Sequence, residues 1–235
     1  MITHRQLTYG NLLFKYRGIL PVPVIILSII LFYYSDSQQI SHQQFIFSLA
    51  VSISGLVVRV VSVGYAFNKT SGKNTKKQIA DNLNTTGIYS LLRNPLYLAN
   101  YLNWLGVILL FSDILITIII TLYFTYIYYY IILVEENFLR DKFKSEYENY
   151  FNDTPRIFPS IKNWKPPKHK FNFIKSLINI KNGLLGISII FYLIYTIDTY
   201  KYSGDFLKIN WLSYLLLFST LFYLSIKLIL KLYKK

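Results

Sequence analysis

The sequence predicts an all-α fold: a polytopic integral membrane bundle of about six transmembrane helices, with a cytoplasmic amphipathic helix. Two observations carry this prediction. The 235 residues are 53% hydrophobic and 18% aromatic, with a mean hydropathy of +0.35, which is too apolar for an ordinary soluble domain. The Lys and Arg residues are also concentrated in alternate loops. We find no repeat or second domain, so residues 1–235 are expected to form a single membrane domain.

Six apolar runs are the candidate spans. A spanning helix needs roughly 20 apolar residues, so the first, third and fifth runs are short. The first run follows Lys15 and Arg17 and lacks a small-residue cleavage site, which favours a retained anchor over a cleaved signal peptide. The runs cover residues 18–34, 43–66, 95–111, 114–134, 183–198 and 211–230.

Positive charge predicts the orientation of these spans. One set of alternating loops carries 22 Lys and Arg residues, whereas the other carries only Lys201 and Lys208. Basic loops face the cytoplasm, so both termini are expected there. The net charge of +14 does not indicate nucleic acid, because the basic residues are interspersed among apolar runs and match no nucleic-acid-binding motif. The basic set comprises residues 1–17, 67–93, 135–182 and 227–235.

The third and fourth runs are predicted to form a tight hairpin. Only Ser112 and Asp113 separate them, which makes the two helices antiparallel neighbours. At about 1.5 Å per residue the helices are roughly 25 and 31 Å long. The chain therefore returns to the cytoplasmic surface at Glu135-Glu136, close to where it left at Arg93. Motifs far apart in sequence should meet there.

The start of the third run is a candidate anion site. Pro95 suits a first helical turn, where its missing N–H would be unpaired anyway. Asn94 is a suitable N-cap that can accept a hydrogen bond from the free amides of that turn. With Arg93 and Tyr89 one turn apart beside it, this helix start would attract a carboxylate or phosphate.

Residues 135–151 form an amphipathic pattern. Glu136 lies on its apolar face, where an unpaired carboxylate would be costly, so we expect a cationic partner for it. Asn152-Asp153-Thr154-Pro155 should end this helix. Residues 160–182 are interpreted as a surface linker before a final helical pair over 183–230. The apolar face comprises Glu136, Leu139, Phe143, Tyr147 and Tyr150.

Together these motifs resemble the isoprenylcysteine carboxyl methyltransferase and phospholipid methyltransferase superfamily over about residues 50–160. The resemblance rests on Gly87-Ile88-Tyr89, Arg93-Asn94-Pro95-Leu96-Tyr97, the Glu135-Glu136 helix with Leu139, Phe143, Tyr147 and Tyr150, and Pro155-Arg156-x-x-Pro159. The upstream stretches 70–75 and 83–86 are similar to a bacterial branch associated with methylation of a lipid A phosphate. This branch implies a location in the bacterial inner membrane.

The resemblance implies a membrane enzyme that uses S-adenosylmethionine without a Rossmann fold. The implied cofactor-binding residues are Tyr89, Arg93, Asn94, Pro95, Tyr97, Glu135, Glu136 and Tyr147, with Arg156 nearby. Two positions depart from the family pattern, because Asn94 replaces the usual His and Lys144 replaces a Gly that commonly follows Phe143. An Asn can still donate and accept hydrogen bonds, but it cannot replace an imidazole base.

The predicted reaction is methyl transfer to an anionic oxygen, a phosphate or carboxylate, of a membrane lipid or lipidated acceptor. Such an oxygen is ionised at neutral pH, so no strong general base is required, and arginine is the expected ligand for it. Arg156 and Arg59 are therefore the candidate catalytic residues. Arg59, inside the second run, either snorkels to the surface or pairs with Glu136 or a substrate phosphate.

Other interpretations remain open at this stage. Arg93 alone would be read as an orientation charge, and Glu135 as a solvated carboxylate. An NADPH-dependent sterol-type reductase has a similar Arg-His-Pro-x-Tyr segment, and a non-catalytic membrane scaffold would tolerate Asn94. With no cysteine and three scattered histidines, the sequence predicts no metal site.

Overall fold

The computed structural model describes residues 2–35, 38–67, 78–111, 113–206 and 208–232, and all regular structure in these residues is helical. The predicted motif at 70–75 and Ser112 of the predicted turn lie outside the described residues. The helices are α1 (His4–Tyr16), α2 (Pro21–Tyr34), α3 (His42–Tyr65), α4 (Ile88–Leu91), α5 (Pro95–Leu109), α6 (Ile114–Asp153), α7 (Phe173–Ser203) and α8 (Trp211–Leu232).

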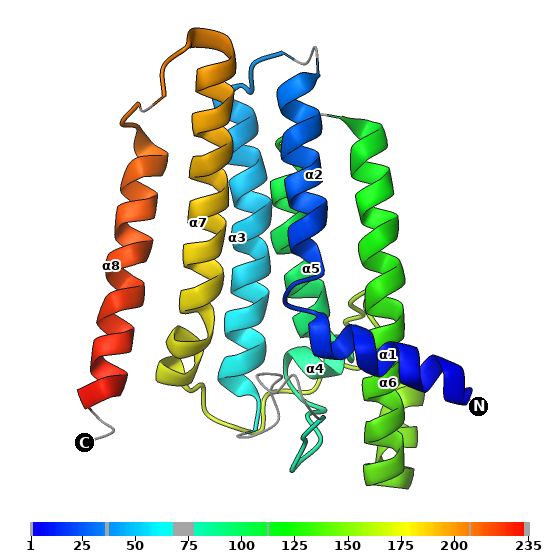
Figure 1. Ribbon diagram of the computed structural model, residues 1–235. Coiled ribbons are helices and arrows are strands. Elements are labelled where there is room, and N and C mark those ends of the chain that lie inside the picture. Colours follow the sequence, from blue (N-terminus) through cyan, green and yellow to red (C-terminus); the bar gives the residue numbers. More distant parts are fainter. Residues whose placement is uncertain (1, 36–37, 68–77, 112, 207, 233–235) are drawn as a thin grey trace.

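The six predicted apolar runs all form helices that lie side by side in one bundle (Figure 1). Among the described residues, α3, α6, α7 and α8 are each long and apolar enough to cross a membrane, and the bent pair α1–α2 would make a fifth span. At 15 residues, α5 is about 22 Å long, which is shorter than the roughly 30 Å hydrocarbon core. The protein is therefore a polytopic helical membrane protein, and its described residues supply four or five spans by length.

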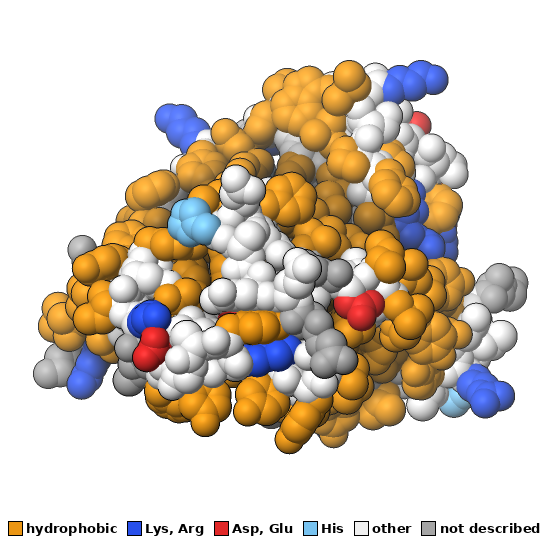
Figure 2. Space-filling model, turned by 90° about the horizontal axis from the view of Figure 1, so that it is seen from above, with side chains coloured by type: hydrophobic (Ala, Val, Ile, Leu, Met, Phe, Trp, Pro, Cys, Tyr) orange, Lys and Arg blue, Asp and Glu red, His pale blue; other side chains and the backbone are white. Residues whose placement is uncertain are grey.

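The outward faces of the bundle suit a lipid environment. Figure 2, which views the molecule along the helices, shows hydrophobic side chains around most of its outline. On α8, large apolar side chains such as Leu217, Phe218, Leu221 and Leu228 are more than half exposed. Lipid tails can cover such side chains without a hydrophobic penalty.

The first helix, α1, was not predicted. Thr3 caps it through a capping box in which Thr3 Oγ1 accepts from Gln6 N and the Gln6 side chain accepts from Thr3 N. The axis of α1 turns by 66° from that of α2, so α1 lies across the end of the bundle against α6 (Figure 1). Gly10 allows this contact, because a Cβ there would lie 2.3 Å from Val134 Cγ2.

Small residues hold α3 and α5 in close contact. A Cβ at Gly55 would lie 2.5 Å from the carbonyl oxygen of Ala99, and one at Gly106 would lie 2.2 Å from Ser52 Oγ. The hydroxyl of Ser52 donates to the carbonyl of Asn103 at 2.9 Å. Small residues are the usual means by which membrane helices approach closely. This contact fixes the position of α3 relative to the start of α5.

The amphipathic helix predicted over 135–151 is continuous with the fourth span but is interrupted at Lys144. Lys144 has φ 47° and ψ −119°, a conformation that glycine adopts with little cost and other residues rarely do. Arg140 forms an ion pair with Glu148, eight residues later, although eight residues of straight helix would span about 12 Å. The chain therefore folds back at Lys144, the position where the resembled family carries Gly.

A strap of residues 155–172 passes along the segment that precedes α5. Gly87 N donates to the carbonyl of Lys165 at 2.8 Å, and Ser160 N donates to the carbonyl of Leu91 at 3.0 Å. Gly87 has φ 61°, and Pro167 lies over it. The predicted linker over 160–182 is therefore wrong in two respects. Its first part is tied down by hydrogen bonds, and its last ten residues belong to α7, which begins at Phe173.

Replacing Gly106 with Ala should destabilise the α3–α5 contact by about 1–3 kcal/mol, because the new methyl group would overlap Ser52. Thermal unfolding of purified protein in detergent measures the effect. Gly186→Ala on α7 is the matched control, since a Cβ there meets nothing within 4 Å. Equal unfolding temperatures for the two variants would contradict the close packing.

Replacing Lys144 with Gly should stabilise the protein by about 1 kcal/mol, since it removes a side chain from a backbone conformation that favours glycine. Lys142→Gly lies on the regular helix just before the break, so it should destabilise by about the same amount. Unfolding temperatures of the two variants should therefore move in opposite directions. If both fell, the backbone at Lys144 would not be strained.

Candidate functional site

A cavity of about 810 Å³ lies where α3, α4, α5, α6 and α7 come together. Seven of the ten predicted site residues line it: Arg59, Tyr89, Arg93, Asn94, Pro95, Tyr97 and Glu135. Other lining residues include Arg17, Asn82, Asn84, Asn100, Asn103, Trp104, Val107, Asn179, Lys181, Asn182, Gly183, Gly186, Ile187 and Ile190. The cavity is thus rich in arginine and amide side chains, with an apolar part along α5 and α7.

Beside the cavity, Glu136 joins three segments of the chain. Its Oε1 accepts from Arg93 Nε at 3.0 Å and from Asn94 Nδ2 at 3.0 Å. Its Oε2 accepts from Arg156 Nη2 at 2.7 Å and from Nε at 3.1 Å. The residue is only 3% exposed. A cationic partner for Glu136 was predicted, and the structure confirms it with two.

Backbone hydrogen bonds reinforce this junction. Arg93 N donates to the carbonyl of Pro155 at 2.8 Å, and Asn94 N donates to the carbonyl of Arg156 at 3.2 Å. Arg93 Nη1 donates to the carbonyls of Phe151, at 2.8 Å, and Thr154. The start of α5, the middle of α6 and the strap are therefore one connected unit. The predicted meeting of the Arg93 and Glu136 motifs is confirmed.

Two sequence-based expectations need correction here, and a third stays a prediction. Asn94 is the N-cap residue of α5 but makes no side-chain cap hydrogen bond, because its amide group donates to Glu136 instead. Arg59 does not pair with Glu136, whose two oxygens are already taken by Arg93 and Arg156. Glu136, Tyr147 and Arg156 are not among the residues that line the cavity, and their predicted roles in the site stay predictions.

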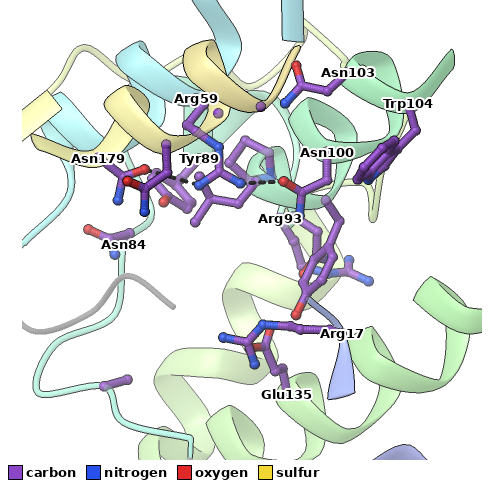
Figure 3. A pocket seen from close by; sticks show the side chains of 18 of the residues that line it. Arg17, Arg59, Asn84, Tyr89, Arg93, Asn100, Asn103, Trp104, Glu135 and Asn179 are labelled. Atoms are coloured by element: carbon purple, nitrogen blue, oxygen red, sulfur yellow. Dashed lines mark hydrogen bonds between the residues drawn. The ribbon is translucent and has the colours of Figure 1, made fainter. Parts of the chain in front are cut away.

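The two adjacent glutamates point in different directions. Consecutive residues on a helix are about 100° apart, so with Glu136 turned toward Arg93 and Arg156, Glu135 lines the cavity. Its carboxylate interacts with the hydroxyl of Tyr97, and Figure 3 shows Arg17 beside it. The interpretation of Glu135 as a solvated carboxylate is therefore wrong.

Tyrosine hydroxyls complete this side of the site. Tyr89 is buried, and its burial, with the nearby Glu135, raises the pKa of its hydroxyl. It therefore stays neutral and able to donate or accept. Tyr150 Oη donates to the carbonyl of Tyr89 at 2.7 Å. Tyr147 is 1% exposed, and its hydroxyl has no partner among the described residues.

On the other side of the cavity, Arg59 is held by two amides. Its Nη1 donates to Asn179 Oδ1 at 3.0 Å, and its Nη2 donates to Asn100 Oδ1. Figure 3 shows both bonds, with Glu135 and Arg17 well apart from them. Sequence reasoning missed Asn100 and Asn179. Asn100 follows Pro95 by five residues on the same helix, which was a usable signal, but nothing in the α7 sequence points to a site.

Comparisons with known proteins bear on the same segment. A family model described as phospholipid methyltransferase matches residues 43–146, which confirms the resemblance predicted from the sequence. This segment runs from α3 to just beyond Lys144 and includes Arg59, Arg93 and Glu135. No solved structure matches the chain.

Two curated relatives have names that refer to metal resistance. Over 77 residues the chain is 36% identical to the cobalt-zinc-cadmium resistance protein CzcN of Cupriavidus metallidurans, covering 33% of this chain and 35% of that protein. Over 113 residues it is 28% identical to the nickel-cobalt-cadmium resistance protein NccN of Alcaligenes xylosoxydans xylosoxydans, covering 48% and 50%. The matches thus span half or less of these relatives.

Replacing Glu136 with Gln should destabilise the protein by about 3–5 kcal/mol, since it leaves two guanidinium groups without their shared carboxylate. Limited proteolysis should then cut the strap. Glu148→Gln is the control, because its ion pair with Arg140 is about half exposed and should contribute at most about 1 kcal/mol. Equal stability of the two variants would show that the Glu136 junction does not hold the fold together.

Proposed function

We propose that this protein is a membrane methyltransferase that transfers a methyl group from S-adenosylmethionine to an anionic oxygen of a membrane lipid or lipidated acceptor. The observation that carries the proposal is the position of the cavity. It joins the start of α5 to Glu135 of α6, and both of these lie inside the segment that matches a methyltransferase family.

The residues of the cavity fit S-adenosylmethionine. About 810 Å³ is within the usual range of small-molecule sites. The carboxylate of Glu135 suits an ammonium group or ribose hydroxyls, and an arginine suits a carboxylate. Tyr89 and Tyr97 offer aromatic faces for an adenine ring or a sulfonium cation. Arg93, Asn94 and Pro95 form the wall, and Glu136 and Arg156 position that wall from behind.

When bound, S-adenosylmethionine supplies an electrophilic methyl carbon attached to a positively charged sulfur. Held beside Glu135, Tyr89 and Tyr97, it would supply this methyl group to the acceptor oxygen, and the electron pair of the carbon–sulfur bond would stay on sulfur. No proton moves, because the oxygen is already ionised. The protein's contribution is to position the two reactants and exclude water. Asn94 is therefore compatible with this reaction, since a histidine base is not required.

We further propose that both termini and the cavity end of the bundle face the cytoplasm of a bacterial inner membrane. The segments that carry 22 of the 25 Lys and Arg residues lead into or out of one end of the bundle, where the described part of each terminus also lies (Figure 1). This distribution supports the orientation, because basic loops remain on the cytoplasmic side.

The names of the relatives suggest a physiological setting for this chemistry. Methylating an anionic oxygen removes a negative charge from the acceptor. A membrane surface with fewer such charges attracts divalent cations less strongly. Under the proposed function, a contribution to metal resistance would run through the charge of the membrane.

Binding of S-adenosylhomocysteine to the purified protein, measured by titration calorimetry, tests the donor site. Replacing Glu135 with Gln should weaken the affinity about tenfold or more, because it removes a charged hydrogen-bonding group. The exposed Lys168 of the strap provides the control variant, Lys168→Ala, whose affinity should be unchanged. Heat from NADPH and none from S-adenosylhomocysteine would support the reductase interpretation instead.

The acceptor can be sought independently of binding. Mass spectrometry of membrane lipids from cells with and without the protein should reveal a species heavier by one CH₂ unit. Absence of such a species, together with absence of S-adenosylhomocysteine binding, would favour a non-catalytic scaffold.

A further inference from the structure

The cavity extends well beyond the segment that matches the methyltransferase family. Asn179, Lys181, Asn182 and Gly183 on α7 line it, whereas the family match ends at residue 146. The donor site proposed above is built from α4, α5 and α6 within the match. The α7 wall of the cavity therefore lies outside the family match.

Two charged side chains, Lys181 and Arg59, line this side of the cavity. Lys181 Nζ donates to the carbonyl of Ile178 on its own helix at 3.3 Å. The charged group that joins two helices here is Arg59. Its two hydrogen-bonding partners, Asn100 and Asn179, are neutral amides, and none of the ion pairs among the described residues involves it. Arg93 and Arg156 differ, because they share Glu136. Arg59 thus keeps a full positive charge in a partly buried position, which is costly unless an anion arrives.

The geometry of Arg59 also suits an oxygen anion. A guanidinium has five N–H donors, and its hydrogen bonds to Asn100 and Asn179 use one on each terminal nitrogen. These two amides come from α5 and α7, so they fix the plane of the guanidinium between two helices (Figure 3). A fixed guanidinium with free donors is suited to bidentate binding of phosphate or carboxylate.

Beyond Arg59 the cavity becomes apolar. Along α5 the lining changes from Asn100 and Asn103 to Trp104 and Val107, and along α7 it changes from Asn179 and Asn182 to Ile187 and Ile190. Both helices run in the same direction, away from the end of the bundle where α1 and the strap lie (Figure 1). Asn179 to Ile190 spans about 16 Å of helix. A ligand held at Arg59 would therefore place a hydrocarbon chain toward the middle of the membrane.

We infer that Arg59, positioned by Asn100 and Asn179, binds the anionic head of the methyl acceptor, and that α7 forms the wall that selects this acceptor. The inference rests on the proposed function and specifies its acceptor as an amphiphile with a phosphate or carboxylate head. Glu135 and Arg17 lie away from Arg59 in the cavity (Figure 3), which separates the side for the donor's ammonium group from the side for the acceptor's anion.

The test uses dodecyl phosphate as the acceptor probe and dodecanol as an uncharged probe with the same chain. Binding of each to the full chain is measured by calorimetry in a neutral detergent, alongside S-adenosylhomocysteine. Arg59→Gln should weaken the affinity for dodecyl phosphate about tenfold or more, because a charged hydrogen bond is lost. The same substitution should leave the affinities for dodecanol and S-adenosylhomocysteine unchanged. Arg59→Lys, which keeps the charge, should restore part of the affinity.

Two further variants keep the test decisive. Asn179→Ala retains Arg59 and removes one of its hydrogen-bonding partners, so it should weaken the affinity for dodecyl phosphate less than Arg59→Gln does. If Arg59→Gln does not fold, Asn179→Ala takes its place in the test. Arg140→Gln, outside the cavity, is the control and should change nothing. Dodecyl phosphate that binds Arg59→Gln and the unaltered chain equally would overturn the inference.

The result also distinguishes this inference from the proposed function. If Arg59→Gln no longer binds S-adenosylhomocysteine but still binds dodecyl phosphate, Arg59 holds the donor's carboxylate. The inference then fails, while the methyltransferase proposal stands. If the unaltered protein does not bind S-adenosylhomocysteine but does bind dodecyl phosphate through Arg59, the proposed reaction fails and an anionic amphiphile site remains.

Discussion

The buried carboxylate of Glu136 is the interaction on which the site depends. A carboxylate 3% exposed would be strongly unfavourable alone, yet this one accepts four hydrogen bonds from Arg93, Asn94 and Arg156. Its donors come from the start of α5 and from the strap, so one carboxylate neutralises a guanidinium group from each of these two segments. The three segments must therefore assemble together, and their assembly forms one wall of the cavity.

Two further constraints then place the groups that face the cavity. The Glu136 junction fixes the rotation of α6, so the preceding residue, Glu135, is directed into the cavity. The close α3–α5 contact through Gly55 and Gly106 sets the height at which Arg59 meets Asn100. The site thus has a carboxylate on α6 and a guanidinium on α3, each held by packing that lies outside the cavity.

Much of this arrangement was predictable from sequence because it follows from local rules. Pro95 marks a helix start, two residues between apolar runs force a hairpin, and an acid on an apolar face needs a cation. Which glutamate faces the cavity was not predictable, because helical periodicity gives relative but not absolute orientation. The fold-back at Lys144 was equally hidden, since lysine is a good helix former and nothing nearby indicates a turn. The α7 wall depends on tertiary packing alone.

Asn94 illustrates how a departure from a family motif can preserve a structure. Its amide group donates to Glu136 and to the carbonyl of Arg156, at 3.0 and 3.2 Å. A neutral histidine can donate only one hydrogen bond from its ring, so Asn satisfies this junction at least as well. What Asn lacks is a group that takes up a proton near neutral pH. An acceptor that reaches the site as an anion needs no such group, and a cavity whose Arg59 has only neutral amides as hydrogen-bonding partners is suited to that kind of acceptor.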